Sequence, residues 1–324
     1  MGLRLCDLGV KMAGTWVETC IERLYAELQA KGIRLRPHVW LSEEWLSPGG
    51  VPGVAVPFYL VHPRLIRLER RMMLEVEGGT PEECMKLLRH ETGHAIEHAF
   101  NVHRKRLWRE HFGRASEPYP DYYRPNPASR RFVHHLDGWY AQSHPEEDFA
   151  ETFAVWLQPR SGWRRRYAGW PALKKLKYVD QLMKEIGGRR SPVRSRATPY
   201  ALGRLRKTLR QYYEEKREWY GVAYSTAYDP HLRRLFSPAS EGRGRGTAAA
   251  FIRRNRRELR RLVCEATGEY QFTVDHILKE MTARCQELGL RAKKPERDLK
   301  LDMAVLLTVQ TMRCLYRGSG WHAV

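Results

Sequence analysis

Two histidines four residues apart, His90 and His94, are the residues whose types and spacing most clearly predict chemistry in this chain. They lie in the stretch TPEECMKLLRHETGHAIEHAF, residues 80–100, and Glu91 directly follows the first of them. In an α-helix, residues four apart project from one face about 6 Å apart along the axis, so both imidazoles can reach one ion. Zinc favours neutral imidazole nitrogens, and a neighbouring carboxylate can accept a proton from an attacking water. The pattern predicts His90 and His94 as zinc ligands and Glu91 as a general base.

The same stretch carries the signals of a well-defined helix. Thr80 is a good N-cap, Pro81 suits the first helical position, and Glu83 completes a capping box. The alternative is that the two histidines fall four apart by chance, and the capped helix makes this less likely than a metal site.

A third zinc ligand has to come from elsewhere in the sequence. His98 lies one further turn along the same helix, but by then the helix has rotated about 80° from His90. A third histidine this close along the chain needs a glycine bend before it, and the stretch HAIEHAF, residues 94–100, offers none. We therefore expect His98 to pack or to be solvated rather than to bind the metal.

Better candidates lie in a second expected helix, HPEEDFAETFAVWL, residues 144–157. Glu147 and Glu151 are four apart on one face of it. One carboxylate could bind zinc, and the other could accept a hydrogen bond from a ligand histidine; the residues alone leave open which does which. Acidic residues early in a helix also favour its dipole, which explains Glu146 and Asp148 better than Glu151.

The stretches RHETGH and HPEEDFAETFA together resemble the zinc-binding metallopeptidases of bacteria. More broadly, the chain looks like the gluzincin catalytic domains of the lethal-factor and Pro-Pro endopeptidase type, which carry H-E-x-x-H on one helix and E-x-x-A-E-x-F on a later one. The second pattern aligns on residues 147–153, so the resemblance implies Glu147 as the third zinc ligand. It also implies Tyr140, seven residues earlier, as the group that steadies the oxyanion; nearby His144 could serve the same role. The resemblance covers about residues 33–158.

The expected fold class is α+β. The resemblance implies a zincin-like catalytic domain, with a small sheet, an active-site helix and a glutamate helix. Short extended candidates lie at residues 33–41, 53–61 and 64–69, and an exposed strand within Val54–Val61 could align a substrate backbone. An amphipathic helix is expected within residues 14–33. Its apolar stripe consists of Val17, Ile21, Leu24 and Leu28.

The charge of the chain, +20 overall, is unevenly distributed. Residues 1–158 carry 20 Lys and Arg against 21 Asp and Glu, whereas residues 159–324 carry 37 against 16. This change predicts a metallopeptidase domain at 1–158 and a basic, mainly helical region at 159–324. Flexible connectors are expected near residues 187–197 and 237–247.

The basic half could attract nucleic acid or an acidic partner. Its stretches GWRRRYAGW, residues 162–170, and FIRRNRRELRR, residues 251–261, interleave arginine with aromatic residues, as nucleic-acid-binding proteins often do. The alternative is that these arginines form solvated helix faces, and no known nucleic-acid-reading motif is present.

No transmembrane segment is expected, because the most apolar window, Val51–Val61, is broken by prolines and is far shorter than the ~20 residues that a span needs. The six cysteines are scattered and form no C-x-x-C pair, which favours a cytoplasmic protein. The sequence as a whole predicts a zinc-dependent peptidase acting on a peptide or protein substrate. Two alternatives remain: a nucleic-acid-associated zinc protease, and a non-catalytic binding module stabilised by zinc.

Overall fold

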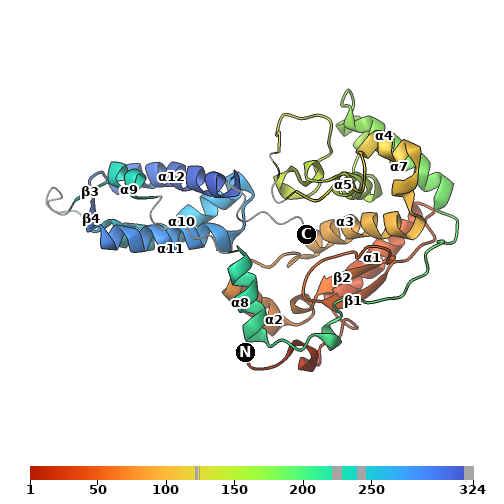
Figure 1. Ribbon diagram of the computed structural model, residues 1–324, viewed down its shortest axis with the longest axis horizontal. Helices are drawn as coiled ribbons and strands as arrows, with labels where there is room; N and C mark the ends of the chain where they lie inside the picture. The colour runs from red at the N-terminus through yellow and green to blue at the C-terminus, as the bar shows by residue number, and fades with distance from the viewer. Residues whose placement is uncertain (121–122, 124, 221–227, 239–245, 317–324) are drawn as a thin grey trace. The chain divides into compact units, whose positions relative to one another are not determined.

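The computed structural model describes the 324-residue chain except for residues 121–122, 124, 221–227, 239–245 and 317–324 (Figure 1). It is mostly helical, with 60% helix and 7% strand, which confirms the predicted α+β class at this level. The chain forms two compact units. The first comprises residues 1–72 and 76–212, and the second comprises residues 73–75 together with the described residues between 213 and 316.

The first unit contains two strands and most of the short helices. Its elements, in chain order, are η1 (Leu5–Asp7), α1 (Trp16–Ala30), β1 (His38–Ser42), β2 (Gly53–Pro57), η2 (Phe58–Val61), α2 (Pro63–Met73), α3 (Pro81–Phe100), η3 (Val102–Arg104), α4 (Arg106–Phe112), η4 (Asp137–Gln142), α5 (Pro145–Leu157), α6 (Trp163–Arg166), α7 (Ala172–Ile186) and η5 (Leu202–Arg204). Helix α8 (Leu209–Tyr220) begins in this unit and ends in the second.

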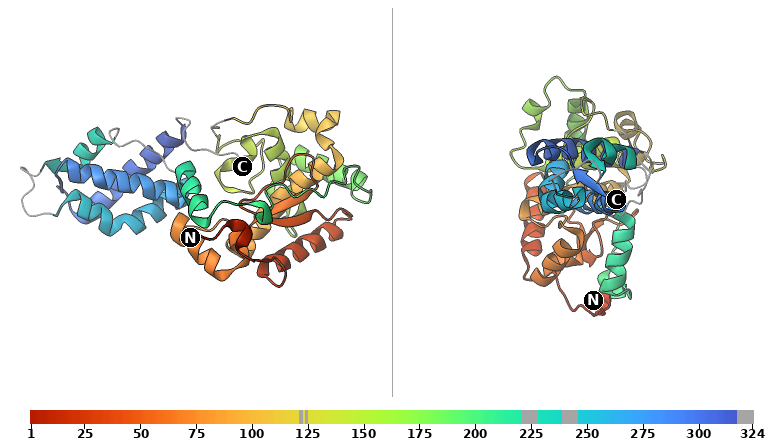
Figure 2. Two further views of the ribbon diagram at one scale, coloured as in Figure 1. Left: turned by 60° about the horizontal axis from the view of Figure 1, so that its bottom comes forward. Right: turned by 90° about the vertical axis from the view of Figure 1, so that its left-hand side faces the viewer.

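Helix α3 is the centre of the first unit. It contacts α1 and β2 on one side and α5 on the other, and α5 in turn packs against α4 and α7 (Figures 1 and 2). The predicted apolar stripe of α1 is buried at all four positions: Val17, Ile21, Leu24 and Leu28. The helix that carries the two histidines is therefore covered on both sides, which holds it in a fixed position.

The small sheet differs from the expectation in two respects. Strands β1 and β2 pair in parallel, with His38 opposite Gly53, and Ala55 of β2 also exchanges backbone hydrogen bonds with Leu46. Every residue of β2 is buried. The prediction of an exposed strand within Val54–Val61 is therefore wrong. Strand β2 is covered, and residues Phe58–Val61 form the 3-10 helix η2. The predicted strand at 64–69 is also wrong, since these residues lie in α2.

The second unit is built on three long helices. Its elements are α9 (Asp229–Leu235), β3 (Phe236–Pro238), α10 (Ala248–Thr267), α11 (Gln271–Glu287), β4 (Leu290–Ala292) and α12 (Glu296–Tyr316). Helices α10, α11 and α12 pack against one another, and β3 pairs antiparallel with β4. Among the described residues of both units, no helix combines the length and the apolar character that crossing a membrane requires.

The main boundary between the two compact units lies after Tyr212, whereas the excess of positive charge begins after residue 158. The reason is that α7 packs on α4 and α5, so the start of the basic half belongs to the first unit. The expected connector near 187–197 is also tied to this unit, because Ser191 and Val193 both donate hydrogen bonds to the carbonyl of Ala99. Most of the second expected connector, near 237–247, lies outside the described residues.

A buried ion pair joins α1 to α3. The guanidinium of Arg89 donates two hydrogen bonds to Glu27, with Nε–Oε2 and Nη2–Oε1 distances of 2.7 and 2.8 Å. Each side chain is only 5% exposed. Because Arg89 directly precedes His90, this pair fixes the helix at the position where the first predicted ligand projects.

Glu27→Gln should destabilise the first unit by about 3 kcal/mol, because it leaves the buried Arg89 guanidinium without a counter-charge. The matched control is Glu185→Gln, which breaks the exposed pair with Lys105 and should cost less than about 1 kcal/mol. Urea titration of the free energy of unfolding measures both. Equal small losses for the two variants would contradict a structural role for the buried pair.

Candidate metal centre

Helix α3 holds the two predicted histidine ligands rigidly. The side chain of Thr80 accepts a hydrogen bond from the backbone N–H of Glu83, as the capping pattern predicts, and the helix ends at Asn101 in the left-handed conformation. His90 and His94 lie in the middle of these 20 residues, where fraying is least. Their rings lie close together, edge to face, with a centroid distance of 4.9 Å and an interplanar angle of 74°.

Helix α5 reaches the histidines because α3 carries a glycine where the two helices cross. A Cβ atom added to Gly93 would lie 2.7 Å from the Cα of Ala150 and 3.2 Å from its Cβ and its carbonyl oxygen. Any side chain at Gly93 would thus collide with the backbone of α5. The close approach brings Glu147, one turn before Ala150, against the two imidazoles.

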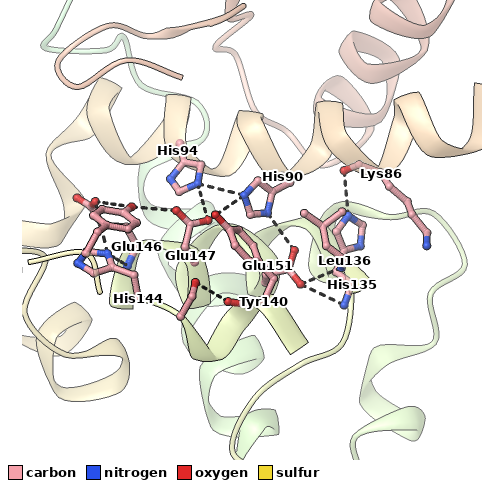
Figure 3. Close-up of polar contacts among 12 residues, drawn as sticks. Lys86, His90, His94, His135, Leu136, Tyr140, His144, Glu146, Glu147 and Glu151 are labelled. Carbon is pink, nitrogen blue, oxygen red and sulfur yellow. Dashed lines mark hydrogen bonds and ion pairs between the residues drawn. The ribbon is translucent and has the colours of Figure 1, made fainter. Parts of the chain in front are cut away.

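The three predicted ligands meet in a small triangle (Figure 3). Glu147 Oε2 lies 3.0 Å from His90 Nε2 and 3.2 Å from His94 Nε2, and the two Nε2 atoms are 3.2 Å apart. Zinc bonds of about 2.0–2.1 Å in a tetrahedral arrangement place ligand atoms about 3.3 Å apart. Two imidazole nitrogens and one carboxylate oxygen therefore fit three corners of a zinc site, and no other residue in the described part of the chain joins this group of candidate ligands.

Burial strengthens the electrostatic coupling within this triangle. The exposed fractions of His90, His94 and Glu147 are 3%, 9% and 1%. Burial would by itself raise the pKa of Glu147, but the two histidines hold that pKa well below its usual range. Burial would likewise lower the pKa of His94, and Glu147 raises it. The carboxylate therefore remains ionised, which is the state that binds a cation.

Glu151 is the outer partner of His90. Its Oε1 lies 2.9 Å from His90 Nδ1, and its Oε2 accepts hydrogen bonds from the backbone N–H groups of His135 and Leu136 (Figure 3). The two N–H donors favour the ionised carboxylate, which can only accept hydrogen bonds, so Nδ1 carries the hydrogen and Nε2 offers its lone pair to the triangle. The structure thus separates the two candidates that the sequence left open, with Glu147 in the group that could hold a metal ion and Glu151 behind His90.

The remaining predicted residues lie around the triangle. Glu91 is buried beside His90 in the chain, and burial raises its pKa against the opposing effect of the two histidines. Tyr140 lies in η4, and its ring centroid is 5.7 Å from that of His90. His98 is not in the ligand group, and burial lowers its pKa to about 4.

His144 is engaged elsewhere. It is the N-cap of α5, and its Nδ1 accepts a hydrogen bond from the backbone N–H of Glu146. Its Nε2 lies 2.9 Å from the carbonyl oxygen of Glu117, to which it donates. With both ring nitrogens used, His144 is a poor candidate for the oxyanion role considered for it.

Tyr119, whose hydroxyl lies 2.9 Å from Glu147 Oε1, was not among the residues predicted from the sequence. This tyrosine belongs to an irregular stretch rich in proline and tyrosine, and no spacing relates it to the histidines. The backbone N–H groups that hold Glu151 were not predicted either, because every residue except proline carries such a donor and the sequence does not distinguish among them.

Residues 84–163 match the family model described as "Putative zinc-binding metallo-peptidase". The matched segment runs from the start of α3 to the start of α6, and it contains both helices of the triangle. No curated protein and no solved structure matches the chain. The match supports the resemblance to zinc-binding metallopeptidases, and the donor set and the family agree on zinc as the metal.

Glu151→Gln should weaken zinc binding about 10–100-fold, because the amide would place an N–H group against His90 Nδ1 and favour the tautomer whose hydrogen points at the metal. Glu147→Gln, which alters a ligand, should weaken binding more. Competition with a chromogenic chelator measures the dissociation constants. A Glu151→Gln protein that binds zinc as tightly as the wild type would refute the orienting role.

Gly93→Ala should separate α3 from α5, lower the free energy of unfolding by about 1–3 kcal/mol and weaken zinc binding. An added methyl group cannot be accommodated by a side-chain movement, because the nearest atom belongs to the backbone of Ala150. Lys86→Ala places an alanine at an exposed position of the same helix and should leave zinc binding unchanged. Chelator competition and urea titration are the measurements, and wild-type affinity in Gly93→Ala would contradict the close-approach argument.

Proposed function

We propose that the first unit is a zinc-dependent peptidase of the gluzincin type with a zincin-like catalytic fold. The observation that carries the proposal is the triangle of His90, His94 and Glu147, in which two nitrogens and one oxygen converge with the spacing of a tetrahedral site. Three protein ligands with a fourth position open are typical of catalytic zinc, whereas structural zinc has four protein ligands. The family match of residues 84–163 points in the same direction.

Zinc in this position would lower the pKa of a water molecule and polarise the carbonyl group of a peptide bond. The protein's own contribution begins with Glu91. Its place next to His90 on α3 puts a buried carboxylate beside the metal ligands. In the proposed reaction Glu91 accepts a proton from the attacking water and passes it to the nitrogen of the leaving amine.

Tyr140 is the proposed donor to the oxygen on which negative charge develops. Its ring lies beside that of His90, so it belongs to the surroundings of the triangle. A phenol donates a hydrogen bond without carrying charge, and a donor fixed before the reaction stabilises the transition state more than the substrate. His90, in turn, is held in its orientation by Glu151.

The test is hydrolysis by the zinc-loaded full chain of a proteome-derived peptide mixture, read by mass spectrometry. Glu91→Gln should keep wild-type zinc content and lose at least about 100-fold in rate, because the amide cannot accept the proton. The control is Glu82→Gln, the same chemical change at an exposed position of α3, which should hydrolyse at the wild-type rate. Zinc removal by a chelator should abolish hydrolysis, and added zinc should restore it.

Two results would count against a peptidase. Full activity in Glu91→Gln would remove the proposed base. Absence of cleavage by the zinc-loaded wild type, together with unfolding of the first unit when zinc is removed, would identify a non-catalytic module stabilised by zinc.

A further inference from the structure

The two oxygens of Glu147 have different partners. Oε2 faces the histidines, 3.0 Å from His90 Nε2 and 3.2 Å from His94 Nε2. Oε1 lies 2.9 Å from the hydroxyl oxygen of Tyr119. The hydroxyl of Tyr119 thus donates a hydrogen bond to the oxygen of Glu147 that points away from the triangle.

The hydroxyl of Tyr119 also lies 3.0 Å from Glu146 Oε2, but it has only one hydrogen to donate. The Glu146 side chain is 20% exposed and can be served by water, whereas that of Glu147 is 1% exposed. An unmet buried acceptor costs more than an unmet exposed one, so the hydrogen is directed at Glu147. Burial, and then the charge of Glu147, raise the pKa of Tyr119 and keep its phenol protonated.

The ring of Tyr119 is fixed to the end of α5 that carries Glu147. It stacks on the imidazole of His144 with a centroid distance of 3.8 Å and an interplanar angle of 18°. His144 caps α5 and donates to the carbonyl of Glu117, two residues before the tyrosine. The ring that carries the hydroxyl is therefore held by contacts that do not involve the metal ligands.

We propose that Tyr119 is a positioning residue that holds Oε1 of Glu147, so that the carboxylate faces the metal through Oε2 alone. A carboxylate can bind a cation through one oxygen or through both. Binding through both would occupy a further coordination position, which is the position that the proposed hydrolysis needs. Tyr119 thereby keeps the site open. The inference rests on the proposed zinc site, but it can be tested without any substrate.

The decisive variant is Tyr119→Phe, which retains the ring that stacks on His144 and removes the hydroxyl. The full-length protein is loaded with cobalt(II), whose visible absorption weakens as its coordination number rises above four. We expect Tyr119→Phe to keep binding cobalt, with a loss of affinity of no more than about 10–100-fold, and to absorb more weakly than the wild type because Oε1 turns to the metal. If the chain hydrolyses peptides, kcat should fall while KM changes little.

Two controls make the result specific. Glu146→Gln alters the other carboxylate within reach of Tyr119 and should leave the cobalt spectrum unchanged. Tyr178→Phe removes a buried hydroxyl that makes no hydrogen bond in the described chain and should also leave it unchanged. A wild-type spectrum in Tyr119→Phe would overturn the proposal. So would complete loss of cobalt binding, or an equal change in Tyr178→Phe, because either would make the role of the phenol merely structural. Failure of hydrolysis alone would refute the peptidase and leave the spectroscopic result standing.

Discussion

The metal centre depends on the contact between the backbones of α3 and α5 at Gly93 and Ala150. On each helix, the two residues that serve the site lie three positions before this contact and one position after it. The distances between the two carboxylates on α5 and the two imidazoles on α3 therefore all depend on where these helices cross. A glycine inside a helix costs about 1 kcal/mol relative to alanine. Here that cost is offset by the packing of two helices whose facing sides are buried along most of their length.

The contact also gathers ionisable groups where water cannot screen them. Glu147 lies between two imidazoles, and Glu151 lies between one imidazole and two backbone N–H groups. Both carboxylates are thus compensated by imidazoles of α3, and Glu151 also by the chain before η4. A buried charge without such partners would cost several kcal/mol. The same arrangement suits a cation, because a bound cation would replace the protons that the imidazoles share with Glu147.

The sequence predicts well which site residues share a face of one helix, and only partly which residues from different segments come into contact. The two histidines and the caps of α3 are read directly, because helical spacing alone puts them on one face. Glu147 and Glu151 share a face of α5, so their roles are separated only by the position of α3, on which the residues are silent; the family resemblance implied Glu147. Tyr119 could not be found, since its contact depends on the path of an irregular segment. Residues 64–69, predicted as a strand, are too few to distinguish a strand from a helix by their pattern. In the structure they belong to the longer helix α2, which continues to Met73.

The function of the basic half of the chain also depends on contacts between residues that the sequence pattern does not show. Arginine alternating with aromatic residues favours nucleic-acid binding only if the rings are free to stack on bases. In the first stretch Trp163 and Tyr167 are buried, and arginines lie over their rings. In the second stretch Phe251 is in the core of the second unit. Two arginines of this stretch, Arg256 and Arg260, both form ion pairs with the buried Asp275. The pattern is thus explained by packing within each unit, and the excess of positive charge is left as a property of the surface, which acts at long range and is weakened by salt.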